Sequence, residues 1–143
     1  MNILVINGPN MNMLGIREPD IYGKNTYEFL ISEITRHCEK NAVGVKCFQS
    51  NHEGDIVDEI QKAYGCFDAV VINAAAYTHT SIAIRDALKS VAIPAVEVHI
   101  SDVDSREDFR KTNYIRDCCF ESISGQGING YLKAIDRIIE TVK

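Results

Sequence analysis

The sequence lacks both a long apolar run and a surplus of basic residues. No stretch approaches the roughly 20 apolar residues of a membrane span, and no basic segment followed by an apolar one opens the chain, so we expect neither a membrane anchor nor a secretory signal. The formal net charge of −5 argues against a nucleic-acid-binding protein, which needs a basic face. A small anionic substrate remains compatible, because a local arginine cluster can sit in an acidic protein.

Cysteine is present, but without the spacing of metal sites or disulfide frameworks. The five cysteines are odd in number, and no C-x-x-C occurs. Cysteine and histidine are not clustered at the short spacings that a zinc site needs, so we expect no metal site. We interpret the cysteines as free thiols of a cytoplasmic protein, and the adjacent pair Cys118 and Cys119 leaves a redox role open.

Motifs for nucleophilic catalysis and phosphate binding are also missing. The chain has no G-x-S-x-G elbow, and the loop after its first apolar run is neither a Walker loop nor G-x-G-x-x-G. No predicted strand end places a cysteine beside a histidine. What remains is acid–base chemistry by tyrosine, arginine, asparagine and histidine.

The 143 residues predict one domain in which short apolar runs alternate with helical periodicity. Strands are expected at 3–6, 43–48, 69–72, 95–98 and, more weakly, 120–123. Helices are expected at 27–38, 53–64, 81–90 and 131–142, with Thr26 and Ser81 as N-caps. This alternation predicts a flavodoxin-like three-layer α/β sandwich with a five-stranded parallel sheet, spanning residues 1–143.

Ligands of such folds bind outside the carboxyl ends of the strands, and unusual polar residues gather at those ends here. Asn7, Gly8, Pro9 and Asn10 follow the first strand, and the loop then continues to residue 23 with little apolar content. The other strand ends fall at residues 49–52, 73–80, 99–102 and 124–127. We therefore predict a ligand site at this edge of the sheet.

Two histidines lie at these predicted strand ends. Glu97 and His99 are two residues apart in a strand, so they share a face, where the carboxylate would orient the imidazole and raise its basicity. His79 lies in the loop after the third strand. The alternatives are a solvated His79 and a buried His99 whose ring bonds to the backbone.

A tyrosine could act as the base, although its reference pKa is about 10. Arg17 is close enough in sequence to Tyr22 to favour the phenolate. The phenolate could then take a proton α to a carbonyl while His99 protonates a leaving hydroxyl. Arg106 and Arg110 carry forked donors that suit a carboxylate, whereas Lys111 is interpreted as part of an exposed turn.

Six segments, in order along nearly the whole chain, resemble the type II 3-dehydroquinate dehydratases: NGPNMNMLGIREPDIYG, QSNHEGDIVDEI, INAAAYTHTSIAIRDAL, VEVHIS, REDFR and GQGINGY. The resemblance implies dehydration of 3-dehydroquinate to 3-dehydroshikimate through an enolate, in the shikimate or quinate pathway. It implies neither metal nor Schiff base, no cofactor, and a homododecamer built as a tetramer of trimers.

The resemblance also implies a role for each matching residue. Tyr22 matches the base, Arg17 the arginine that activates it, and Asn10 the residue that stabilises the enolate through a water. His99, supported by Glu97, matches the general acid. Arg106 matches an arginine without a direct role. The remaining matches are substrate-binding residues, with Asp86 contributed by a neighbouring subunit and the main-chain amides of Ile100 and Ser101 holding the carboxylate: Asn73, His79, Asp86, Ile100, Ser101 and Arg110.

Two positions depart from the family pattern. Ala75 lies in a run of alanines where the family usually has a glycine, so its β-carbon would crowd the nearby backbone or demand a negative φ. Asp102 replaces a common asparagine and adds an anion near the carboxylate site unless it points away.

Other proteins share the predicted fold. A flavin-binding protein needs a Ser/Thr-rich phosphate loop after the first strand, which is missing here, and a receiver domain needs acidic residues where Asn7 and Asn73 stand. A flavodoxin-like protein without catalytic activity remains an alternative that only an assay separates.

Overall fold

The computed structural model describes residues 1–16, 18–22 and 25–142, with the backbone alone described for Pro19 and Tyr22. A five-stranded parallel sheet in the order β2-β1-β3-β4-β5 forms its centre, which confirms the predicted fold class. The observed strands lie within one or two residues of the expected ones: β1 (Asn2–Asn7), β2 (Gly44–Gln49), β3 (Ala69–Asn73), β4 (Ala95–His99) and β5 (Glu121–Ser124).

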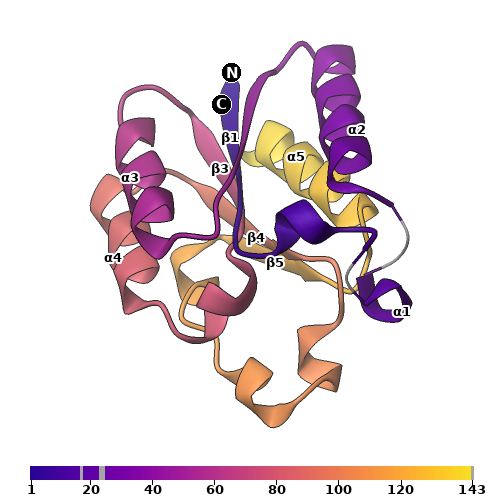
Figure 1. Ribbon diagram of the computed structural model, residues 1–143. Helices are drawn as coiled ribbons and strands as arrows, with labels where there is room; N and C mark the ends of the chain where they lie inside the picture. The colour runs from indigo at the N-terminus through magenta and orange to yellow at the C-terminus, as the bar shows by residue number, and fades with distance from the viewer. Residues whose placement is uncertain (17, 23–24, 143) are drawn as a thin grey trace.

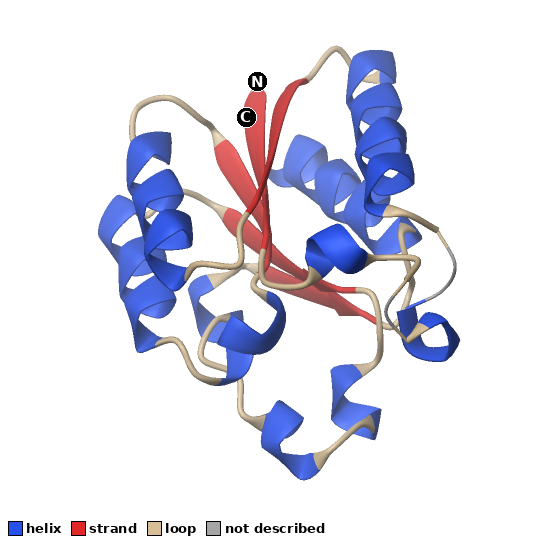
Figure 2. Cartoon of the chain, viewed as in Figure 1, coloured by secondary structure: helices blue, strands red, loops and turns tan. Residues whose placement is uncertain are grey.

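Helices cover both faces of the sheet, as Figures 1 and 2 show. On β1, Ile3 and Val5 pack with the helices of one face, while Leu4 and Ile6 pack with those of the other. This alternation follows from the two-residue period of a strand, and it explains why every residue of the run is apolar. One face carries α2 (Tyr27–Lys40) and α5 (Asn129–Thr141), and the other carries α3 (Glu53–Ala63) and α4 (Ile82–Val91).

Two helices begin at the predicted caps. The Thr26 hydroxyl accepts a hydrogen bond from the N–H of Phe29 at 3.1 Å, and the Ser81 hydroxyl accepts one from the N–H of Ile84 at 2.9 Å. Each bond satisfies an N–H that lacks an intrahelical partner in the first turn. Ser81 thereby fixes where the chain leaves the loop after β3 and enters α4.

The connections that follow the strands contain short helices that periodicity did not predict. They are α1 (Pro19–Tyr22) and the 3₁₀ turns Met11–Met13, Ala75–His79, Val103–Ser105, Asp108–Lys111 and Arg116–Cys118. Such single turns are too short to show a periodic apolar pattern. All five cysteines are free thiols. No helix within the described residues has the length and apolar composition needed to cross a membrane.

Candidate active site

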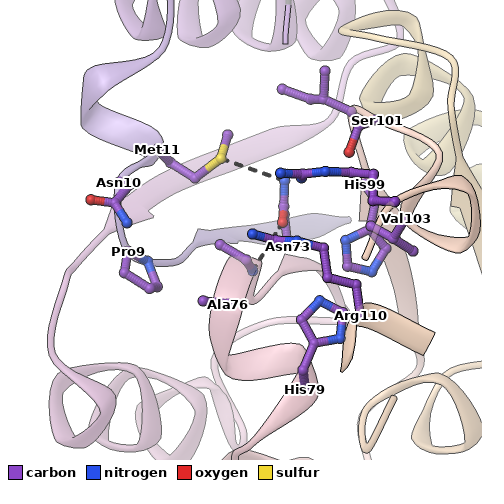
Figure 3. A pocket seen from close by; sticks show the side chains of 13 residues that line it. Pro9, Asn10, Met11, Asn73, Ala76, His79, His99, Ser101, Val103 and Arg110 are labelled. Carbon is purple, nitrogen blue, oxygen red and sulfur yellow. Dashed lines mark hydrogen bonds between the residues drawn. The ribbon is translucent and has the colours of Figure 1, made fainter. Parts of the chain in front are cut away.

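A cavity opens at the carboxyl ends of β1, β3 and β4. About 480 Å³ of empty space, part of it open to solvent, lies between its walls. Figure 3 shows Pro9 and Asn10 on one side, His99 and Ser101 on the other, and Asn73 between them. The described residues that line it are Pro9, Asn10, Met11, Asn73, Ala75, Ala76, His79, His99, Ile100, Ser101, Val103, Arg106 and Arg110.

The loop after β1 is held close to the loop after β3. Gly8 donates its N–H to the carbonyl oxygen of Asn73 at 2.8 Å. A β-carbon at Gly8 would lie only 2.4 Å from the carbonyl oxygen of Ala74, so only glycine allows this approach. Asn10 has a φ of 69°, in the left-handed region that asparagine tolerates, and its N–H donates to Oδ1 of Asn51 at 3.0 Å.

Replacing Gly8 with alanine is expected to lower the free energy of unfolding by about 2 kcal/mol, because backbone must move to admit the methyl group. Urea unfolding of the two proteins measures this difference. Gly54→Ala is the matched control, since nothing lies within 4 Å of a β-carbon at that helical position. Equal stability of the Gly8 variant and the unaltered protein would show that the two loops are not closely packed.

β4 brings Glu97 and His99 together. The Glu97 carboxylate is fully buried and accepts hydrogen bonds from the Ser122 hydroxyl at 2.6 Å and from Nδ2 of Asn113 at 2.8 Å. Nε2 of His99 lies 3.1 Å from Oε2 of Glu97, and Nε of Arg116 lies 3.6 Å from Oε1. The imidazole of His99 therefore lies close against the carboxylate, but without the alignment of a hydrogen bond.

These neighbours decide the charge of Glu97. Burial alone would raise its pKa, but His99 and the hydrogen bonds from Ser122 and Asn113 outweigh burial and lower the pKa to about 2. Glu97 is therefore a carboxylate throughout the physiological range. Glu97 thus places a fixed negative charge against the His99 ring, which lines the cavity.

His79 presents a different chemistry to the same cavity. Its Nδ1 lies 2.7 Å from the carbonyl oxygen of Thr112, which can only accept, so Nδ1 carries a hydrogen. Burial lowers the pKa of His79, and the bond to Thr112 offsets only part of that effect. In the neutral ring Nε2 is an acceptor, suited to a substrate hydroxyl.

Two arginines supply positive charge at the cavity. Nε of Arg110 donates to Oε2 of Glu107 at 2.7 Å, and its guanidinium lies over the Phe109 ring at 5.3 Å from the centroid. Arg106 lies 3.7 Å from Oε2 of Glu18 and 3.8 Å from Oε2 of Glu107, so it links the loop after β1 to the 3₁₀ turns after β4. Sequence reasoning assigned Arg106 no direct role, yet its side chain lines the cavity wall.

Residues 125–127 fix the orientation of the main chain at the end of β4 through hydrogen bonds. The carbonyls of His99 and Ile100 accept from the N–H groups of Gly125 and Gly127 at 3.3 and 3.1 Å. In a trans peptide the N–H points opposite to the C=O, so the N–H groups of Ile100 and Ser101 point away from that turn. Two successive amides aimed to one side suit an anion such as a carboxylate.

The structure shows what becomes of Ala75 and Asp102, the two positions that depart from the family pattern. Of the two consequences expected of the Ala75 β-carbon, crowding of the backbone or a negative φ, the negative φ is wrong, because Ala75 has a φ of 53°. That conformation lets its N–H donate to Oδ1 of Asn73 at 3.1 Å at the start of the 3₁₀ turn. The Asp102 carboxylate caps the next 3₁₀ turn by accepting from the N–H of Asp104 at 3.2 Å, and it is not among the residues that line the cavity.

Not every predicted site residue is placed at the cavity. Arg17 lies outside the described residues, and so does the side chain of Tyr22, whose backbone ends α1. Glu97 touches the cavity only through His99, and Asp86 is exposed on α4, away from the described cavity lining. Asn7, which also supports the site without lining it, was marked by its place at a strand end. The other polar residues that support the site gave no local signal in the sequence: Thr112, Asn113, Ser122 and Tyr131.

Comparisons with known proteins agree along nearly the whole chain. The family model Dehydroquinase class II matches residues 1–139. The 3-dehydroquinate dehydratase of Lachnoclostridium phytofermentans is 54% identical over 140 residues, 97% of each chain. That of Prochlorococcus marinus (strain MIT 9301) is 51% identical over 139 residues, 97% of this chain and 95% of the other. The crystal structure of type II dehydroquinase from Butyrivibrio crossotus DSM 2876 has a TM-score of 0.96 at 53% identity and covers 97% of both chains.

Proposed function

The chain belongs to the class II dehydroquinase family, and we propose that the cavity at the ends of β1, β3 and β4 is where it removes water from 3-dehydroquinate. The activity is that of a 3-dehydroquinate dehydratase, a carbon–oxygen hydro-lyase. One observation carries the assignment of the site: a buried carboxylate–imidazole pair opens on a cavity that also holds His79 and Arg110.

The reaction removes a proton α to a ketone and a hydroxide from the neighbouring carbon, which together make water. We assign protonation of the departing hydroxyl to His99, with Glu97 as the fixed anion that orients the ring. The support is geometric: the ring lines the cavity, while the carboxylate behind it is wholly buried. A product with a conjugated double bond follows once the enolate expels the hydroxyl.

Proton abstraction is assigned to Tyr22, activated by Arg17, through the family match alone. Both residues belong to the loop between β1 and α2, and closing such a loop over bound substrate would exclude water. The enolate oxygen would be stabilised by Asn10, acting through a water, from the opposite side of the cavity to His99. The left-handed backbone at Asn10 holds that side chain in the turn after β1.

Substrate binding is assigned to the remaining polar residues of the cavity. The successive amides of Ile100 and Ser101 suit the substrate carboxylate, and Arg110 adds positive charge. The acceptor Nε2 of His79 and the amide of Asn73 suit substrate hydroxyls. No cofactor or metal is required by this scheme.

We assign Asp86 to the active site of a neighbouring subunit within a homododecamer arranged as a tetramer of trimers. Its support is the family match together with its exposure on α4, which leaves the carboxylate accessible to another copy. A cytoplasmic location is proposed with it, in keeping with five free thiols.

Purified protein is expected to convert 3-dehydroquinate with undiminished rate in excess EDTA and after borohydride treatment with substrate present. The physical reason is that the proposed scheme takes its acid from His99, its base from Tyr22 and its anion binding from Arg110 and the main chain, without a metal or an imine. Growth of the ultraviolet absorbance of the conjugated product measures the rate. Inhibition by EDTA that added metal reverses, or inactivation by borohydride, would contradict the scheme, and a protein without turnover would favour a non-catalytic relative.

A further inference from the structure

Three polar side chains are buried between the carboxyl end of the sheet and α5. Asn7 ends β1, Asn73 ends β3 at the paired position of the sheet, and Tyr131 lies in the first turns of α5. Asn7 and Tyr131 are 0% exposed and Asn73 is 4% exposed. Polar groups withdrawn from water to this extent are costly unless each finds a partner, so their pairing indicates what they do.

The hydrogen bonds run in one direction through the three residues. Nδ2 of Asn73 donates to the Tyr131 hydroxyl at 2.8 Å, and that hydroxyl donates to Oδ1 of Asn7 at 2.6 Å. Oδ1 of Asn73 accepts from the N–H of Ala75 at 3.1 Å, and because a backbone N–H only donates, the orientation of the Asn73 amide is fixed. Burial raises the pKa of Tyr131, so the hydroxyl keeps the proton that it donates.

One hydrogen of the Asn73 amide is left with a weak partner. Besides bonding to Tyr131, Nδ2 lies 3.6 Å from the sulfur of Met11, and both side chains line the cavity, as Figure 3 shows. A thioether is a weak acceptor, so a substrate oxygen would be a better partner for that hydrogen. The bond to Tyr131 determines where it points, because the two hydrogens of a planar amide are rigidly related.

We propose that Tyr131 is a positioning residue for the dehydration, holding the Asn73 amide so that its second N–H is directed at a hydroxyl or carbonyl oxygen of the bound substrate. The proposal rests on the function proposed above. It makes α5 part of the active site, although Tyr131 is 58 positions from Asn73 and 124 from Asn7.

Tyr131→Phe tests this role because it removes the hydroxyl and keeps the ring. The KM for 3-dehydroquinate is expected to rise about tenfold, the effect of one misdirected hydrogen bond, with kcat changed less than about threefold. Tyr27→Phe is the matched control: the Tyr27 hydroxyl on α2 also bonds to Asn7, but Tyr27 does not line the described part of the cavity. Its KM is expected to stay within about twofold of the unaltered value.

A double-mutant cycle separates positioning from general stability. In an Asn73→Ala background, Tyr131→Phe is expected to change KM no further, because the amide that it positions is absent. Asn7→Ala, which removes the acceptor of the hydroxyl and leaves the Tyr131 ring in place, is expected to raise KM in the same direction. It also provides the test if Tyr131→Phe does not fold.

An unchanged KM in Tyr131→Phe, or an equal rise in KM with and without the Asn73 amide, would overturn the proposal. Those outcomes require that the unaltered protein dehydrates 3-dehydroquinate. Absence of turnover in the unaltered protein would instead contradict the proposed function, so the two failures are distinguishable.

Discussion

Replacing His99 with alanine is expected to lower kcat for dehydration of 3-dehydroquinate by about a thousandfold, since a positioned general acid contributes typically 10²–10⁴. The His99 ring lines the cavity and lies 3.1 Å from a carboxylate that cannot move, because Ser122 and Asn113 hold it from behind. Alanine leaves the departing hydroxyl without a proton donor. Because Glu97 is then a buried anion without its main partner, the variant is also expected to be less stable.

Steady-state kinetics give kcat, and deuterium exchange shows which step is lost. If His99 is the acid, its loss leaves proton abstraction intact, so substrate recovered from D₂O should carry deuterium at the carbon α to the ketone. His37→Ala is the matched control, because Nε2 of His37 pairs with Asp136 at 2.7 Å between α2 and α5, a histidine–carboxylate contact outside the cavity. A His99 variant with normal kcat and weakened binding alone would remove it from the role of acid.

The Glu97–His99 contact could be predicted because it depends only on local geometry. Two residues separated by one position in a strand share a face, whatever the rest of the chain does. The sheet could be predicted for a similar reason, since fully apolar runs bounded by polar residues are typical of strands buried on both sides. The polar ends of those runs then meet at one edge of a parallel sheet, which is where the cavity lies.

The buried hydrogen bonds that join Asn73, Tyr131 and Asn7 could not be predicted in this way. Hydrophobic periodicity assigned Tyr131 to the apolar face of the last helix. This assignment is correct for the ring, which packs in the core, but it does not predict the hydrogen bond of the hydroxyl. Its partners are separated from it by 58 and 124 positions, and only the packing of α5 on β1 and β3 brings them together. A negative φ was expected of Ala75 from local preference, but the residue has a positive φ and bonds through its N–H to Asn73, a combination that local preference does not predict.

The contact between Glu18 and Arg106 is another feature that the sequence did not predict. Both were visible as charged residues in polar stretches, where a solvated surface is the ordinary expectation. Their approach to 3.7 Å ties the loop after β1 to the turn after β4, the two segments that flank the cavity. An ion pair between two loops that are distant in the sequence leaves no pattern in that sequence. The family resemblance therefore identified Arg106 as a matching residue but did not reveal its contact with Glu18.

Tyr22→Phe is expected to lower kcat by at least about a thousandfold while substrate still binds, because phenylalanine keeps the ring and removes the only group assigned to take the proton. A tyrosine hydroxyl with its reference pKa of about 10 is a poor base near neutrality, so the assignment also requires a cation such as Arg17 beside it. The test therefore includes Arg17→Ala, whose kcat should fall at neutral pH and recover partly as the pH rises toward the pKa of the phenol.

Deuterium exchange distinguishes this variant from His99→Ala. Without the base no enolate forms, so substrate recovered from D₂O should carry no deuterium beyond that of an enzyme-free sample, whereas the His99 variant should show exchange. Tyr64→Phe is the control for the loss of a tyrosine hydroxyl, since Tyr64 is 71% exposed and lies outside the cavity lining. Near-normal turnover in Tyr22→Phe, or exchange in the absence of its hydroxyl, would assign proton abstraction to another group, and the neutral His79 ring would then be the first candidate among the described residues.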